Sequence, residues 1–377
     1  MKGTIIALIS AFTAMALLPM LGMGETAVTQ TAAARESSVC TDTAGSTDEA
    51  QTDGSTAPQS TAENTSVQTS ESDSPSGDNS REDSHGFPEA AVFRILDTGT
   101  GEVITVSDRE FCCGALAYEM PPGYEQEALK AQCIACYTHF CRLREQQRSG
   151  PDAELKGADF SADLSDDEFY ISNEHMKKSW GKMYADSRSR IESAVDAAAG
   201  LVLTDENGEL IDAAYHAISG GVTESAADIF GREDKHLLAV ASPWDRSAPD
   251  YCTKKEFTEK EFVKLLKENN SKLNSKTVLA QDEFKAERTN SGAVLEMDIG
   301  GCKLSGAELR SIFSLRSCDF DLQHKNKKFI FTTRGYGHGV GMSQNGAQCM
   351  AQQGEDYREI LLHYYTDVDI TSYKNDL

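Results

Sequence analysis

Basic residues are scarce in this sequence of 377 residues, which has 36 Lys and Arg against 60 Asp and Glu and a net charge of −24. Nucleic acids and anionic lipid surfaces bind proteins mainly through clustered positive charge. The composition therefore argues against both as partners. No internal repeat is visible either.

Large apolar side chains are almost absent from residues 24–86, where 12 acidic and two basic residues are scattered among Ser and Thr. Such a segment cannot bury enough apolar surface to offset the entropy lost on ordering. We predict a disordered acidic tether. As a random coil its 63 residues would span about 45 Å root-mean-square, and more if the charges repel.

Charge is also absent from Gly3 to Met23, a run of 21 residues that could cross a bilayer as a helix. We predict that residues 1–23 are an uncleaved membrane anchor, because the run exceeds the usual signal-peptide core and no small-residue cleavage site follows it directly. A cleaved signal peptide is the alternative. Since Lys2 lies on the short N-terminal side, the charge bias places the rest of the chain outside the cell membrane.

Cysteine, by contrast, is plentiful. Nine of the ten cysteines lie beyond the tether, and because nine is odd, at least one of these thiols is free or paired with another molecule. Four residues recur at the spacing of one buried helix face: Leu129, Cys133, Cys136 and Phe140. At such positions cysteine acts as a small hydrophobe. A metal centre or a disulfide among these cysteines is the less favoured alternative.

Residues 87–377 alternate short β-rich runs with helical patterns, which predicts one mixed α+β domain with a substrate groove. We expect strands at 91–97, 102–107, 277–282, 293–299 and 327–333, and a hairpin over 201–217 that turns at Asn207 and Gly208. We expect helices at 108–118, 125–144, 174–180, 187–200, 258–267, 306–311, 348–353 and 355–366. Asp356 and Glu359 have the spacing of a capping box for the last of these helices.

Residues 334–347 read RGYGHGVGMSQNGA, with a glycine at every second position from Gly335 to Gly341. Glycine removes Cβ and permits positive φ, which a chain needs where its backbone meets a ligand or turns very tightly. The loop follows a β-rich run, as phosphate-binding loops do. The GK[ST] ending is missing and no G-x-G-x-x-G aligns, so we reject a nucleotide site.

Two further segments are distinctive: EMPPGYEQEALKAQCIACYTHF at 119–140 and AYHAISGGVTESAADIFG at 214–231. Together with 334–347, and in this order, they resemble the signature blocks of the stage II sporulation protein D family. We number them blocks one, two and three along the chain. The resemblance covers roughly residues 89–370.

The resemblance implies a lytic transglycosylase at the cell surface that cleaves peptidoglycan glycan strands without a cofactor. The substrate strands would be ones from which an amidase has removed the stem peptides. The process would be engulfment during sporulation or a related remodelling of the wall. It also implies a cell-wall amidase and membrane proteins of the engulfment machinery as partners. The alternative function is that of a non-catalytic glycan-binding module that stimulates an amidase, as relatives described as amidase enhancers are thought to do.

A lytic transglycosylase can use one carboxyl group, which protonates the leaving oxygen and then deprotonates the C6 hydroxyl of the same muramic acid to close a 1,6-anhydro ring. Glu127 matches the family's signature glutamate, and we predict that it is this group and that it faces block three and the 219–225 turn. The alternative is an ordinary first-turn acid favoured by the helix dipole. Glu119 is the reserve acid.

The expected substrate-binding residues are Glu119, Tyr215, His216, Ser219, Gly220, Thr223, Glu224, Ser225, Arg334, Tyr336, His338, Ser343 and Gln344. Short hydroxyls and a carboxylate beside two glycines suit the hydroxyl-rich edge of a sugar, although Thr223 and Ser225 could instead cap a helix. Arg334, Tyr336 and Gln344 could hold acetamido or carboxylate groups. His216 and His338 are expected to line the groove, with general bases, metal ligands or purely structural imidazoles as the alternatives.

The chain departs from the family pattern in two places. Tyr137, Thr138 and His139 stand where relatives usually have Arg-Thr-Tyr, which alters rate or preference if that arginine positions the substrate or the acid, and changes nothing if it only anchors the helix. Some relatives carry a Cys/His zinc site after this helix. Residues 163–170 contain neither residue, so we predict that this zinc site is absent.

Overall fold

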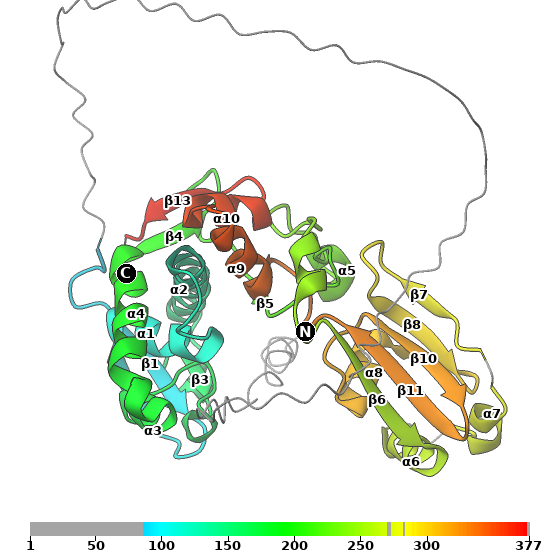
Figure 1. Ribbon diagram of the computed structural model, residues 1–377. Helices are drawn as coiled ribbons and strands as arrows, with labels where there is room; N and C mark the ends of the chain where they lie inside the picture. The colour runs from blue at the N-terminus through cyan, green and yellow to red at the C-terminus, as the bar shows by residue number, and fades with distance from the viewer. Residues whose placement is uncertain (1–85, 270–272, 282, 375–377) are drawn as a thin grey trace, which may run out of the picture. The chain divides into compact units, whose positions relative to one another are not determined.

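The computed structural model describes residues 86–374 except 270–272 and 282 (Figure 1). The predicted anchor and nearly all of the predicted tether lie outside these residues. Within 86–374 as described, no helix is long and apolar enough to span a membrane. The part that is described mixes helices with several small sheets, which confirms the α+β class.

A long central helix, α2 (Gln126–Ser149), organises the first of two buried hydrophobic clusters. It packs against α1 (Asp108–Glu119), α4 (Tyr184–Ala197), α9 (Gln344–Gln352), α10 (Tyr357–Tyr364) and strand β4 (Leu201–Thr204). Its predicted stripe is confirmed, since Leu129, Cys133, Cys136 and Phe140 are all at most 3% exposed. Five of the nine cysteines beyond the tether are buried: Cys112, Cys113, Cys133, Cys136 and Cys141.

A hairpin leads into this cluster. Strands β1 (Val92–Asp97) and β2 (Val103–Ser107) pair antiparallel as predicted, and β3 (Phe160–Ala162) adds to β1 in parallel. Ser107 ends the hairpin and caps α1, because its side chain accepts a hydrogen bond from the amide of Glu110. The cap therefore fixes where α1 begins, and so the direction in which its last residue, Glu119, lies.

The second hydrophobic cluster is formed by a continuous stretch between blocks two and three. It contains β6 (Cys252–Thr258), α6 (Glu259–Asn269), α7 (Ser275–Leu279), β7 (Ala286–Arg288), β8 (Val294–Ile299), β9 (Cys302–Ser305), α8 (Gly306–Phe313), β10 (Phe320–Lys325) and β11 (Lys328–Arg334). Its first and last strands pair antiparallel, with Arg334 opposite Cys252. The amide of Gly335 then donates to the carbonyl of Tyr251 at 2.7 Å. The chain thus leaves and re-enters the first cluster at one point, which brings blocks two and three together.

The remaining elements are short. They are η2 (Ala153–Leu155), η3 (Leu164–Asp166), α3 (Asn173–Trp180), η4 (Gly181–Met183), β5 (Tyr215–His216), α5 (Ala226–Phe230), η5 (Pro243–Ser247), β12 (Met342–Ser343) and β13 (Asp369–Ser372). Strand β13 pairs antiparallel with β4, and β12 pairs in parallel with β5.

Two sequence-based assignments were wrong. Residues 275–279 form helix α7 where a strand was expected over 277–282, because Asn274 caps the helix at Lys276 and Val278 is buried. The hairpin predicted over 201–217 has its turn, but beyond it only the bridge between Thr204 and Leu210 is formed. The second arm fails because Tyr215 and His216 pair with residues of block three.

Candidate functional site

Blocks two and three are interleaved through their backbones. Tyr215 lies opposite Met342 and His216 opposite Ser343 in the β5–β12 pair. Two isolated bridges extend the contact, one from Ile218 to Tyr336 and one from Glu224 to Val340. The two segments, about 120 residues apart in sequence, therefore form one unit.

The glycines of block three make this close contact possible. Gly335, Gly337, Gly339 and Gly341 all have positive φ, between 73° and 114°, as their spacing predicted. A Cβ at Gly341 would lie 1.9 Å from the carbonyl oxygen of Ala214, and one at Gly337 would lie 2.8 Å from Cβ of His216. The backbone of block three thus lies directly against block two of the same chain.

The carboxyl group of Glu119 is where block one meets the other two. Glu119 is the last residue of α1 and is partly exposed. The hydroxyl of Tyr215, from block two, donates to its Oε1 at 3.1 Å, and Nε2 of Gln344, from block three, donates to its Oε2 at 3.1 Å. Three distant parts of the sequence therefore converge on one carboxyl group.

Burial raises the pKa of Glu119 to about 7, against an opposing effect of the hydrogen bonds from Gln344 and Tyr215. The position at the C-terminal end of α1 also disfavours a negative charge. Both forms of the group are therefore populated near neutral pH. Next to it, burial and then the charge of Glu119 raise the pKa of Tyr118, and Tyr336 of block three contributes in the same direction.

Glu127 has different surroundings. It lies in the first turn of α2, where its Oε1 pairs with Nζ of Lys130 at 2.6 Å and its Oε2 accepts a hydrogen bond from the amide of Tyr357 at 3.1 Å. Neither partner belongs to block two or block three. The contacts of its carboxylate are therefore with α2 and with the start of α10, whereas the sequence-based prediction placed Glu127 opposite blocks two and three.

Sequence reasoning missed Asp245, a fully buried carboxylate in η5. It accepts hydrogen bonds from the amide and hydroxyl of Ser219 at 3.0 and 2.6 Å, from the hydroxyls of Ser242 and Ser343 at 2.9 Å each, and from Nδ2 of Asn345 at 3.0 Å. Ser343 also caps α9, the helix that starts with Gln344. Asp245 therefore ties block two to the segment that positions Gln344 against Glu119. No periodicity or motif marks it in the sequence.

Several predicted substrate-binding residues of block two are used inside the fold. Thr223 is fully buried and its hydroxyl accepts from the amide of Val240 at 2.9 Å. Ser225 caps α5, and Glu224 is 6% exposed and accepts from the amide of Ala293 at 3.1 Å. The carbonyl of Gly220 accepts from the hydroxyl of Tyr251 at 3.0 Å. For Ser225 the capping alternative is thus the one observed.

The two histidines have lowered pKa values and are neutral at physiological pH. His216 is 1% exposed, its Nδ1 contacts the carbonyl of Val340 at 3.1 Å, and burial lowers its pKa. Nδ1 of His338 accepts from the amide of Val340 at 3.1 Å, and burial lowers its pKa to about 3. Both imidazoles are therefore held by the backbone that joins blocks two and three.

The family departure at Tyr137 falls in the core. Tyr137 is 1% exposed and its hydroxyl donates to Asp108 at 2.7 Å, and the same carboxylate pairs with the buried Arg144 at 2.8 Å. Thr138 donates to the carbonyl of Ile134 and accepts from the amide of Leu203. These contacts are those of a helix anchor.

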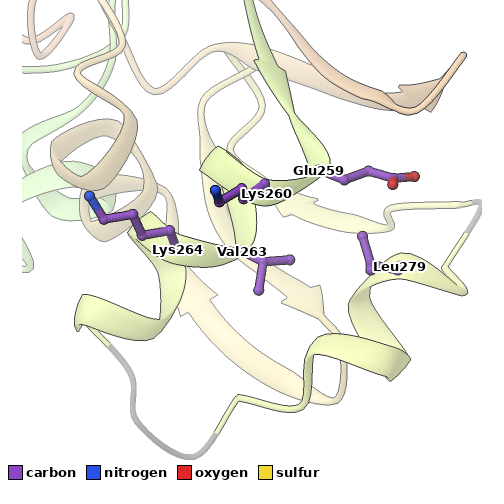
Figure 2. A pocket seen from close by; sticks show the side chains of 5 residues that line it. All are labelled: Glu259, Lys260, Val263, Lys264 and Leu279. Carbon is purple, nitrogen blue, oxygen red and sulfur yellow. The ribbon is translucent and has the colours of Figure 1, made fainter.

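Other parts of the described chain do not join this site. The group of three side chains that could hold a metal ion is Asp205, Glu206 and His236, but Glu206 pairs with Lys235 and His236 contacts the carbonyl of Thr366. A pocket lies in the second cluster, lined by Glu259, Lys260, Val263, Lys264 and Leu279 (Figure 2). Neither set includes a residue of the three blocks.

Known proteins are similar to this chain over about three quarters of its length. A family model described as "Stage II sporulation protein" matches residues 97–204. Stage II sporulation protein D of Bacillus amyloliquefaciens is 35% identical over 281 residues, which cover 74% of this chain and 78% of the relative. The chain belongs to the stage II sporulation protein D family. Its counterpart from Bacillus subtilis is 32% identical over the same shares of both chains.

Family membership makes this a sporulation protein and is consistent with a role at the cell wall. A more distant relative, named "Amidase enhancer" in Bacillus subtilis, is 24% identical over 310 residues, which cover 69% of this chain and 40% of that protein. The chain is thus similar to proteins named for more than one role.

Proposed function

We propose that this protein is a peptidoglycan lytic transglycosylase in which Glu119 is the general acid and base. The observation that carries the proposal is the carboxyl group of Glu119, partly exposed, held by one donor from each of the other two blocks, with a pKa of about 7. A group with this pKa can give up a proton and take one back at neutral pH.

The reaction needs only this one carboxyl group. The protonated form of Glu119 gives its proton to the glycosidic oxygen as the bond to C1 of muramic acid breaks. The resulting carboxylate takes the proton of the C6 hydroxyl as O6 bonds to C1, which closes the 1,6-anhydro ring without adding water. Tyr215 and Gln344 donate to the carboxylate between these steps. Glu127 is a weaker candidate because its carboxylate is engaged by Lys130 and by the amide of Tyr357, outside blocks two and three.

The proposal includes the setting inferred from the sequence. Residues 1–23 anchor the chain in the cell membrane, residues 24–86 form an acidic tether, and residues 87–377 form the catalytic part on the outer side of the membrane. A tether of this length allows the catalytic part to reach glycan strands some distance from the membrane. The preferred strands lack stem peptides, so a cell-wall amidase acts before this protein and is its partner.

The products test the reaction. We expect the full chain, incubated with peptide-free glycan strands, to release fragments with 1,6-anhydromuramic ends, which are one water lighter than hydrolytic ends. Mass spectrometry of the fragments distinguishes the two. Reducing muramic ends alone would make the protein a hydrolase instead.

A non-catalytic role as an amidase enhancer is the second candidate, favoured by the similarity to the protein of that name. It predicts that the full chain binds glycan strands and raises the rate of a cell-wall amidase while forming no fragments of its own. The same incubation, with and without an amidase, separates the two functions.

A further inference from the structure

The arginine expected to meet a substrate carboxylate is already neutralised. Arg334 pairs with Asp319 at 3.0 Å and also contacts the carboxylate of Asp321. Its neighbour Arg288 pairs with Asp321 at 2.8 Å in the same cluster. An anionic ligand would have to displace these carboxylates before Arg334 could bind it.

Arg316 is another arginine beside block three, and its charge is far less compensated. Its guanidinium lies 4.1 Å from the centre of the Tyr336 ring, and its carbonyl accepts the amide of Gly337 at 2.9 Å. Its ion pair is with Asp250 at 3.7 Å, and the side chain of Asp250 is 60% exposed. Exposed pairs of this kind contribute little free energy. Arg316 itself keeps 22% of its side chain exposed, so a ligand can reach it.

The stacking geometry prepares this guanidinium for a carboxylate. A guanidinium over an aromatic ring uses its flat face, so N–H groups in its plane can still form a two-pronged hydrogen bond. In Arg316, Nε is buried and Nη1 lies 3.7 Å from the carboxylate of Asp250, so a ligand carboxylate would bind Nη1 and Nη2 in place of Asp250. Tyr336 also raises the pKa of Tyr118, the residue that directly precedes Glu119 in the sequence. The stacked pair therefore lies near the residue that directly precedes the proposed acid.

We propose that Arg316, stacked on Tyr336, binds the free lactyl carboxylate of a muramic acid from which the stem peptide has been removed. The inference rests on the proposed function and names the chemical feature of the substrate that the site recognises. A stem peptide turns this carboxylate into a neutral amide, so the arginine distinguishes the two kinds of strand. The chain carries a net charge of −24 and so repels anions overall. An accessible cation at this point therefore favours binding of an anionic ligand here.

The test compares two substrates that differ only in this charge. Peptide-free strands are used as they are, or with the lactyl carboxylate converted to its methylamide. We expect the full chain to have a kcat/KM at least about tenfold higher on the carboxylate strands, the range of one charge-assisted hydrogen bond. Arg316→Gln should reduce that ratio toward one, and Arg316→Lys should keep part of it. Lys260→Gln, which removes one exposed positive charge from α6, is the matched control and should keep the full ratio.

Two outcomes overturn the inference. One is a wild-type protein that does not distinguish the two substrates. The other is an Arg316→Gln protein that keeps its melting temperature and whose kcat/KM falls by the same factor on carboxylate and methylamide strands. That result would mean that Arg316 only supports Tyr336. If no strand is cleaved, so that the proposed function fails, binding of the peptide-free disaccharide and its methylamide decides instead. Preference for the carboxylate that Arg316→Gln abolishes upholds the subsite, and equal binding rejects it.

Discussion

Glu119→Gln should lower the rate of anhydro-product formation by at least about 100-fold, the lower end of what general acid-base catalysis contributes. Glutamine keeps the size of the side chain and can still contact Tyr215 and Gln344, but it has no proton to transfer. The rate is measured with the full chain on peptide-free strands, from the amount of anhydro ends formed per unit time. Binding of the strands should change little.

The matched control is Glu127→Gln, the same substitution eight residues further along the chain. It removes the ion pair with Lys130 and weakens the contact with the amide of Tyr357, so we expect a loss of about 1 kcal/mol in stability or less. Activity should remain close to that of the wild type. A folded Glu127→Gln protein without activity, beside an active Glu119→Gln protein, would reverse the assignment.

Stability at high pH shows whether the Glu119→Gln fold is intact. The pKa of Glu119 is about 7 in the folded chain against an ordinary value of 4.5, so the folded state favours the protonated form. That contribution to stability is present below about 4.5 and is lost as the pH rises through 7. Glutamine never ionises. The variant should therefore melt no lower than the wild type at pH 8.

Asp245→Asn should destabilise the protein by about 3 kcal/mol or more, as expected when a buried, hydrogen-bonded charge is removed from its partners. Five donors, four side chains and one backbone amide, now share the carboxylate. An amide has one acceptor oxygen for them, and its NH₂ group would face hydroxyl and amide donors. Urea unfolding of the full chain measures the change.

Asp250→Asn is the control for this prediction, because Asp250 is a mostly exposed carboxylate only five residues away. It should change stability by no more than about 0.5 kcal/mol. If Asp245→Asn has an equally small effect, the Asp245 network does not hold blocks two and three together. The position of Gln344 beside Glu119 would then have another origin.

The features predicted correctly from the sequence are mostly local. The capping box of Asp356 and Glu359 is present at α10, because both hydrogen bonds join residues three apart. The stripe of Cys133 and Cys136 is buried because helical spacing alone places both on one face. The positive φ angles of the block three glycines likewise follow from the residue type. Such features need no knowledge of distant partners.

The features that the sequence did not reveal depend on contacts between residues far apart in the chain. Nothing local shows that Tyr215 pairs with Met342 instead of completing a hairpin. Thr277 and Val278 suggested a strand, but the cap from Asn274 and the packing of Val278 decided for a helix. Glu127 was ranked above Glu119 on its match to the family, because the contacts that set Glu119 apart come from residues about 100 and 225 positions away. Asp245 was invisible for the same reason.

The central claim is that Glu119 holds a proton near neutral pH at the point where the three blocks meet. Its carboxyl carbon can be followed by NMR in the full chain with ¹³C-labelled glutamate, and assigned as the signal missing from Glu119→Gln. We predict a titration midpoint near 7, well above the ordinary value of 4.5. A midpoint at or below 4.5 would contradict the account, because the group would then be ionised at neutral pH and could not act as the acid.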